Sequence, residues 1–168
     1  DEKKLSSFLK DFAAIEEKKI LIHGGGKIAT SIGNKLGIES KYADGRRITD
    51  AATIDLVTMV YAGLINKKIV AQLQSFHCNA LGISGADGNL IPAMKRPVKD
   101  IDYGFAGDID TDNMMALYWD ELLQIGFTPV ASPITHDGKG QLLNTNADTI
   151  AQEVAKTMSG FYNVSLIY

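Results

Sequence analysis

Short apolar runs alternate along this chain with longer stretches whose apolar residues recur at helical spacing. Each apolar run is bounded by turn-forming residues, which is typical of buried strands. The predicted strands are 18–23, 79–84, 128–132 and 163–168. The predicted helices are 4–17, 26–36, 50–76, 112–126 and 147–160. This alternation predicts an α/β fold, a mostly parallel sheet sandwiched between helices in three αβα layers.

Capping residues predict where two of these helices begin. Thr49 or Asp50 can cap the long helix that runs to about residue 76, and Gly63 or Asn66 could divide it. Asp112 is expected to cap the helix that follows it. Aspartate, serine and threonine favour this position because their side chains accept bonds from unpaired backbone amides.

Two hairpins are predicted inside the α/β pattern. Residues 40–49 place an Asp-Gly turn at positions 44 and 45, and residues 90–109 form a longer hairpin with a polar, solvated tip. With 168 residues, 45% of them hydrophobic, and no internal repeat or linker, we expect one domain, 1–168. The first helix has no strand before it and the last strand has no covering helix, so we expect the chain to be truncated at both ends.

Three consecutive glycines follow the first predicted strand in the sequence His-Gly-Gly-Gly-Lys, residues 23–27. Amides at the start of a helix carry the positive end of its dipole, and glycine lets a ligand approach them. The loop could therefore cradle a phosphate or a carboxylate, or it could be a tight connection packed against a neighbour. The helix after it should carry Ile28, Ile32 and Leu36 on one face and stop at Gly37.

Polar residues follow two other predicted strands. Arg46 and Arg47 lie on one arm of the first hairpin, where they should point to opposite faces, and a guanidinium binds a carboxylate with two parallel bonds. Asn144 and Asn146 could donate to a ligand, and Asp148 lies in the first turn of the next helix. The alternatives are solvated arginines and simple capping residues. Because the arginines and the polar residues 144–148 are all expected at the carboxyl ends of strands, a ligand site there is favoured.

Other reactive residues form no recognisable catalytic or metal-binding pattern. His23, His77 and His136 have no metal-ligand spacing and are expected at strand ends or on the surface. Cys78 follows a histidine, but adjacent side chains of an extended chain face opposite ways, which argues against a nucleophile pair. The basic run 94–99 lacks interleaved aromatic residues and is expected at the solvated hairpin tip.

Charge and cysteine content narrow the class of protein. The net charge of −3 argues against a nucleic-acid or membrane partner, and no apolar stretch is long enough to span a bilayer. One cysteine cannot form an internal disulfide, which suits a reducing compartment. We expect a cytoplasmic protein.

The ordered set "HGGG", "DGRRIT" and "LLNTNAD" resembles the acetylglutamate kinases of the amino-acid kinase family over essentially the whole chain. The resemblance implies transfer of the γ-phosphoryl of ATP to the side-chain carboxylate of an N-acylated glutamate, with Mg²⁺, in arginine biosynthesis. It also implies that Gly25 and Gly26 bind the reacting groups, Arg47 the α-carboxylate and Asn144 the α-substituents. Asp148 would orient two catalytic lysines.

The family also carries a first strand with a "K-x-G-G" motif and a second, ATP-binding lobe, and neither is present in these residues. The resemblance therefore implies an N-acylglutamate-binding lobe that is inactive by itself, and no ATP-binding residue can be named. The acyl group could be acetyl or succinyl. A non-catalytic acylglutamate-binding module and another carboxylate or phosphate kinase of the family are further alternatives. Relatives of this kind assemble at least as dimers, so we expect a homo-oligomer.

Overall fold

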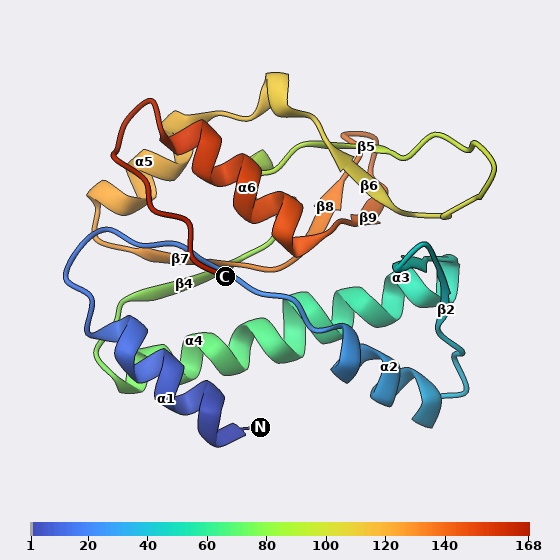
Figure 1. Ribbon diagram of the computed structural model, residues 1–168, viewed down its shortest axis with the longest axis horizontal. Helices are drawn as coiled ribbons and strands as arrows, with labels where there is room; N and C mark the ends of the chain where they lie inside the picture. Colours follow the sequence, from blue (N-terminus) through green and yellow to red (C-terminus); the bar gives the residue numbers. More distant parts are fainter. Residues whose placement is uncertain (1) are drawn as a thin grey trace.

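A computed structural model describes residues 2–168 as three layers, with a parallel sheet between two layers of helices (Figure 1). The predicted fold class is confirmed. The helices are α1 (Glu2–Ala13), α2 (Gly26–Lys35), α3 (Ala51–Val57), η1 (Thr58–Ile65), α4 (Asn66–Ser75), η2 (Asp87–Asn89), η3 (Thr111–Asn113), α5 (Ala116–Gln124) and α6 (Ala147–Met158). The strands are β1 (Leu21–Ile22), β2 (Lys41–Ala43), β3 (Arg46–Ile48), β4 (Ala80–Ile83), β5 (Ala93–Lys95), β6 (Gly107–Ile109), β7 (Thr128–Ala131), β8 (Ile134–His136) and β9 (Leu142–Asn144). Among residues 2–168, none of the helices has the length and apolar character needed to cross a membrane.

The central sheet has three parallel strands in the order β1, β7, β4. Successive side chains of a strand point to opposite faces, so Val130 and Ala131 of β7 enter different hydrophobic clusters. The Val130 cluster includes residues of α1, α3, η1 and α4, and the Ala131 cluster includes residues of α5 and α6. Figure 1 shows α5 and α6 above the sheet and α1 and α4 below it. Both faces of the sheet are therefore covered.

Three antiparallel hairpins, β2–β3, β5–β6 and β8–β9, lie together on the right of Figure 1. The first turns at Asp44 and Gly45, whose φ values of 48° and 73° match the expected turn, and the hairpin predicted over 90–109 is confirmed as β5–β6. Backbone bridges join them, one of them between Ala106 and Asn144. The hairpins thus form one framework beside the carboxyl ends of the sheet strands.

The long helical region is confirmed from Ala51 to Ser75, but its middle is a π-helix. Asp50, the second of the two expected caps, accepts a 2.8 Å hydrogen bond from the backbone N of Thr53. Gly63 lies inside η1, and Asn66 begins α4. The predicted division is therefore real, and it takes the form of wider helical turns, which occur often at functional sites.

Helix α2 ends at Lys35 with Leu36 as its C-cap, and Gly37 follows with the left-handed φ of 75° that suits the predicted stop. Ala29 and Gly33 are its buried residues, whereas Ile28 and Leu36 are exposed. A Cβ at Gly33 would lie 2.8 Å from the side chain of Leu56 in α3. The two helices therefore pack so closely that only small residues fit between them.

Helix α1 ends earlier than predicted, at Ala13. The Nζ of Lys19 donates to the carbonyl of Ala13 at 3.0 Å and to that of Ile15, and it lies 5.5 Å from the centre of the Phe12 ring. A cation near the last carbonyls stabilises a helix end. The strand that follows is correspondingly shorter than expected.

The cap predicted at Asp112 was wrong, because this residue lies in the separate short helix η3. The side chain of Asn113 donates to Asp110 at 2.8 Å, which stabilises that local turn. Helix α5 therefore begins only at Ala116, with Met115 at its N-cap and no capping side chain.

Residues 163–168, predicted to form a strand, have no regular secondary structure. Their apolar side chains are exposed, above all Ile167 and Tyr168. A strand is stabilised by the hydrogen-bond ladder that a neighbour completes. No strand within residues 2–168 pairs with this segment, so its apolar composition alone does not make it extended.

Candidate functional site

One cavity of about 1650 Å³ borders the carboxyl ends of β1 and β9. Its walls include Gly25, Gly26, Arg47, Asn144 and Asp148, so the structure brings all five candidate residues to one place. The cavity also extends along α1, β1 and α6, where many of its walls are apolar. Residues from distant parts of the sequence therefore share one solvent-accessible space.

The glycine loop starts α2 at the wall of this cavity. Gly25 is the N-cap residue with an extended φ of 167°, and no side chain caps the helix. Amides of an uncapped first turn need acceptors and carry the positive end of the helix dipole. A Cβ at Gly25 would lie 2.9 Å from the Tyr61 ring and would also meet Ile65. The loop is thus pressed against η1 on one side and borders the cavity on the other.

Arg47 lines the same cavity although only 7% of its surface is exposed. Its Nη2 donates to the Gly26 carbonyl and to Thr30 Oγ1, both at 3.0 Å. Its Nη1 donates to Ser40 Oγ, and the guanidinium lies 4.9 Å from the centre of the Tyr42 ring. These contacts join the β2–β3 hairpin to α2 and hold a positive charge beside the glycine loop. A guanidinium has five N–H donors, so these bonds do not exhaust its capacity for a carboxylate.

The sequence analysis did not identify the side chains that surround Arg47 and the loop. Thr30 lies one helical turn after Gly26, a spacing that could have indicated it. Tyr61 had no such signal, because its place depends on the π-helix. Burial raises the pKa of Tyr61 above its ordinary value of 10.0, and the charge of Arg47 opposes that rise. Tyr61 therefore packs behind the loop as a neutral phenol.

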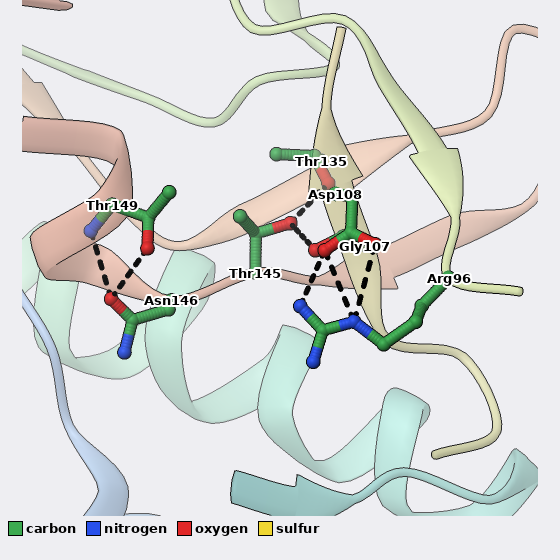
Figure 2. Close-up of polar contacts among 7 residues, drawn as sticks. All are labelled: Arg96, Gly107, Asp108, Thr135, Thr145, Asn146 and Thr149. Atoms are coloured by element: carbon green, nitrogen blue, oxygen red, sulfur yellow. Dashed lines mark hydrogen bonds and ion pairs between the residues drawn. The ribbon is translucent and has the colours of Figure 1, made fainter. Parts of the chain in front are cut away.

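The turn from β9 into α6 holds Asn144, Asn146 and Asp148, and their environments differ. The Nδ2 of Asn144 donates to Thr49 Oγ1 at 3.0 Å, and the half-buried side chain lines the cavity. The Oδ1 of Asn146 accepts from the backbone N of Thr149 at 2.8 Å, so Asn146 caps α6 (Figure 2). Asp148 lies in the first turn of α6, exposed at the cavity.

A second polar cluster lies on and beside the β5–β6 and β8–β9 hairpins (Figure 2), and its members Arg96, Gly107 and Thr145 line the cavity. The hydroxyls of Thr135 and Thr145 are 2.8 Å apart, and that of Thr145 donates to the Gly107 carbonyl at 3.5 Å. Arg96 binds Asp108 through Nε at 3.0 Å and through Nη2, and this hydrogen bonding raises the pKa of the guanidinium. The expectation of a solvated tip was wrong for Arg96, because Asp108 holds it against the hairpin.

His23 is a buried histidine at the end of β1, on the cavity wall, whereas His77 and His136 lie away from the cavity lining. Its Nδ1 lies 2.9 Å from the Gly24 carbonyl oxygen, and its Nε2 lies 3.2 Å from Asn66 Nδ2. Burial lowers the pKa of His23 below its ordinary value of 6.5, and the bond to Gly24 opposes part of that shift. His23 is therefore neutral at pH 7.

This burial predicts that the protein loses stability as the solution becomes acidic. Below pH 6.5 the unfolded chain binds a proton at His23 that the folded chain does not, so the free energy of unfolding falls with falling pH. The slope from one such group is at most about 1.4 kcal/mol per pH unit. Urea unfolding at pH 7.5 and 5.5 should show a larger loss for wild type than for His23→Asn. Equal losses in the two proteins would contradict the prediction.

Within residues 2–168, no group of three or more histidine, cysteine, aspartate or glutamate side chains could hold a metal ion. Cys78 is buried, and its Sγ donates to Thr128 Oγ1 at 3.5 Å. Asp148 could provide a single oxygen ligand, but Mg²⁺ requires a near-octahedral set. These residues alone do not make a magnesium site.

Comparison with known proteins places the chain among related sequences. The model of the amino acid kinase family matches residues 1–160. An acetylglutamate kinase of Cytophaga hutchinsonii is 58% identical over 165 residues, covering 98% of this chain and 62% of the relative. An acetylglutamate kinase of Bacteroides fragilis is 55% identical over 168 residues, covering 100% of this chain and 64% of the relative. The chain thus spans less than two thirds of the length of either relative.

A solved structure, smu.665 from Streptococcus mutans UA159, has a similar fold. Its TM-score is 0.78 at 20% sequence identity, and the match covers 92% of this chain and 61% of that chain. At this level of identity the likeness supports the three-layer architecture alone.

Proposed function

The chain belongs to the amino acid kinase family, and from this premise we propose that residues 1–168 form the N-acylglutamate-binding lobe of an acetylglutamate kinase. The full-length enzyme transfers the γ-phosphoryl group of ATP to the side-chain carboxylate of N-acetyl-L-glutamate. The product is an acyl phosphate that serves arginine biosynthesis. In this proposal the lobe is a single domain, and the ATP-binding residues lie outside it.

One observation carries the proposal, the meeting of Arg47 and the uncapped start of α2 at one cavity. Both features favour negative charge, and they lie on neighbouring parts of its wall. A substrate with two carboxylates separated by a short carbon chain suits such a pair. N-acylated glutamate has this chemistry, which supports the assignment.

The proposed chemistry is positioning and charge neutralisation. Arg47 holds the α-carboxylate, Asn144 holds the α-substituents, and the amides of Gly25 and Gly26 meet the side-chain carboxylate. One oxygen of that carboxylate forms a bond to the γ-phosphorus while the bond from phosphorus to the β-phosphate oxygen breaks. ADP leaves with that electron pair. Amides aimed at the transferring oxygens stabilise their charge, and no covalent enzyme intermediate is needed.

Asp148 is proposed to orient the two lysines that the family uses against the phosphoryl group. Asp148→Asn in the full-length protein should reduce kcat by about 10²-fold, as loss of an electrostatic contact to the transition state does. The KM for N-acetyl-L-glutamate should change by less than about threefold, because the substrate contacts remain. Asp112→Asn, which removes an exposed carboxylate away from the cavity lining, is the control. A kcat equal to wild type in Asp148→Asn would refute this role.

A succinyl group is a second candidate for the acyl position. It would bring a further carboxylate to the cavity, and the presence of Arg96 on the wall favours testing it. Arg96 already binds Asp108, so a succinyl carboxylate would have to share that guanidinium. Acetyl therefore remains the first choice, because it leaves this ion pair undisturbed.

The remaining parts of the proposal concern cofactors, assembly and location. ATP is the phosphoryl donor and Mg²⁺ neutralises its phosphates, as is general for phosphoryl transfer. The enzyme is a homo-oligomer and acts in the cytoplasm. Its reaction partner is a small molecule, with no nucleic acid or membrane involved.

The test is acyl phosphate formation by the full-length protein with Mg·ATP, trapped as a hydroxamate by hydroxylamine. N-Acetyl-L-glutamate and N-succinyl-L-glutamate are compared by kcat/KM, with carbamate and aspartate as substrates of other family members. A preference for the acetyl compound supports the proposal, and a preference for the succinyl compound corrects the acyl group. Binding of an acylglutamate without hydroxamate formation would instead indicate a non-catalytic binding module. Activity on carbamate or aspartate alone would reject acylglutamate as the substrate.

A further inference from the structure

We propose that His23 is a positioning residue that holds the peptide between Gly24 and Gly25 so that the Gly25 amide points into the cavity. The inference deepens the proposed function and rests on it, because it concerns the amide assigned to the reacting groups. His23 itself is not assigned any contact with the substrate.

The His23 ring forms a hydrogen bond with the Gly24 carbonyl, and Nδ1 lies 2.9 Å from the carbonyl oxygen. A carbonyl oxygen can only accept, so Nδ1 carries the proton. The peptide bonds of residues 2–168 are all trans, and in a trans peptide the carbonyl and the following N–H point in opposite directions. Holding the Gly24 oxygen toward the ring therefore directs the Gly25 N–H away from it.

The other side of the His23 ring is held by Asn66. The Nε2 of His23 lies 3.2 Å from Nδ2 of Asn66, which also donates to the Val130 carbonyl at 2.8 Å. Since Nδ1 is protonated, Nε2 is the acceptor and takes one of the two amide protons. The Oδ1 of Asn66 accepts from Lys67 Nζ at 3.2 Å. Each donor in this series of hydrogen bonds meets an acceptor, so both the tautomer of the His23 ring and the orientation of the Asn66 amide are determined.

Close packing against β4 keeps Asn66 in place. Asn66 is 1% exposed, and a Cβ at Gly82 of β4 would collide with its Oδ1 and lie 2.7 Å from Lys67 Nζ. Lys67 Nζ also donates to the Gly82 carbonyl at 3.0 Å. The absence of a side chain at Gly82 thus lets the start of α4 lie directly on the sheet. The glycine loop is tied through His23 to β7 and β4, not to its own helix alone.

A matched pair of variants separates positioning from simple filling of the core. Asn at position 23 places an amide nitrogen where Nδ1 lies and can keep the bond to Gly24. Gln places its amide near the position of Nε2, so it can keep the bond to Asn66 but not the one to Gly24. Both replace a buried ring by a smaller polar side chain and should lower the Tm to a similar extent.

In the full-length protein, we expect His23→Asn to retain kcat within about threefold of wild type. We expect His23→Gln to lose about 10- to 100-fold in kcat, less than the loss on deleting such a donor outright, with KM for N-acetyl-L-glutamate little changed. Equal kcat in the two variants would overturn the proposal. So would a loss that appears only in KM, because that pattern indicates altered substrate binding.

A measurement independent of activity distinguishes failure of this inference from failure of the proposed function. The ¹⁵N spectrum of the histidine rings in the wild-type protein should show His23 protonated at Nδ1 and bare at Nε2, with the His23→Asn spectrum identifying its signals. An Nε2-protonated ring would overturn the inference even in an active kinase. A wild type that makes no acyl phosphate but has an Nδ1-protonated ring would contradict the proposed function. The proposed orientation of the Gly25 amide toward the reacting groups would then fail as well. The hydrogen bonds from Gly24 through His23 to Asn66 would remain supported.

Discussion

Replacing Arg47 with alanine should weaken the binding of N-acetyl-L-glutamate to the full-length protein by about 1.5 to 3 kcal/mol, roughly 10- to 150-fold in Kd. The loss is expected because the substrate's α-carboxylate would no longer meet a charged hydrogen-bond donor. The bonds from Arg47 to Gly26, Thr30 and Ser40 would also disappear, which weakens the attachment of the β2–β3 hairpin to α2 and leaves the 2.9 Å bond between the hydroxyls of Thr30 and Tyr42. Calorimetric titration measures the first effect and urea unfolding the second.

The neighbouring arginine supplies the control. Arg46 is exposed on the same strand, so Arg46→Ala removes the same charge without breaking the contacts to α2. We expect its Kd to stay within about threefold of wild type, as for the loss of a solvated charge. Arg47→Lys keeps the charge but not the planar fork and should bind nearly as poorly as the alanine variant. Similar affinities for Arg46→Ala and Arg47→Ala would show that Arg47 has no special role.

Replacing Gly25 with alanine should have a still larger effect on the reaction. The added Cβ would meet the Tyr61 ring at 2.9 Å and the end of Ile65, both buried, so the loop must move toward the cavity. Overpacking of this kind costs about 1–3 kcal/mol of stability. A displaced amide no longer meets the transferring oxygens, which predicts a loss of about 10²- to 10³-fold in kcat. Hydroxamate formation and urea unfolding measure the two effects.

Gly24→Ala is the matched control for the stability effect, because a Cβ there meets nothing within 4 Å. Its free energy of unfolding should stay within about 0.5 kcal/mol of wild type, as for most surface substitutions. If both alanine variants unfold like wild type, Tyr61 and Ile65 can yield to the new methyl group. The steric account of the Gly25 position would then be wrong.

The parallel sheet and two of the hairpins were predictable because their local patterns are distinct. Strand β4 is a continuous apolar run and β7 is mostly apolar, as expected for strands covered on both faces. The Asp44-Gly45 turn suits the positive φ values that its hairpin requires. Local chemistry of this kind acts over a few residues and can be read without knowledge of the partners.

Features that depend on distant partners could not be predicted in the same way. The exposure of Ile28 follows from the close approach of α2 and α3, and the 163–168 segment lacks the neighbour that a strand needs. Gly63 indicated a possible division of the long helix, but helical periodicity did not show that residues 58–65 wind as a π-helix.

Only part of the candidate site could be predicted from the sequence. Three glycines after a strand and an Arg-Arg pair on a hairpin are visible in the sequence, and packing against η1 accounts for only one of these glycines, Gly25. The choice of Arg47 over Arg46, however, came from family resemblance, and in the structure it is Arg47 that contacts Thr30 and Ser40. The contact between His23 and Asn66 was not predicted, because the two residues are 43 positions apart in the sequence.

The π-helix η1 has a consequence for the angular phase of the long helix. Each residue of an α-helix turns the chain by about 100°, whereas a π-helix bonds each N–H to the carbonyl five residues back and so turns less per residue. The eight residues from Thr58 to Ile65 therefore decide which side of α4 meets the sheet. Deleting one of them to restore α-helical winding would rotate Asn66, Ile69 and Leu73 by about 100° relative to β7. The number of residues in η1 therefore sets the direction in which Asn66 faces His23, and through this contact it affects the position of the glycine loop.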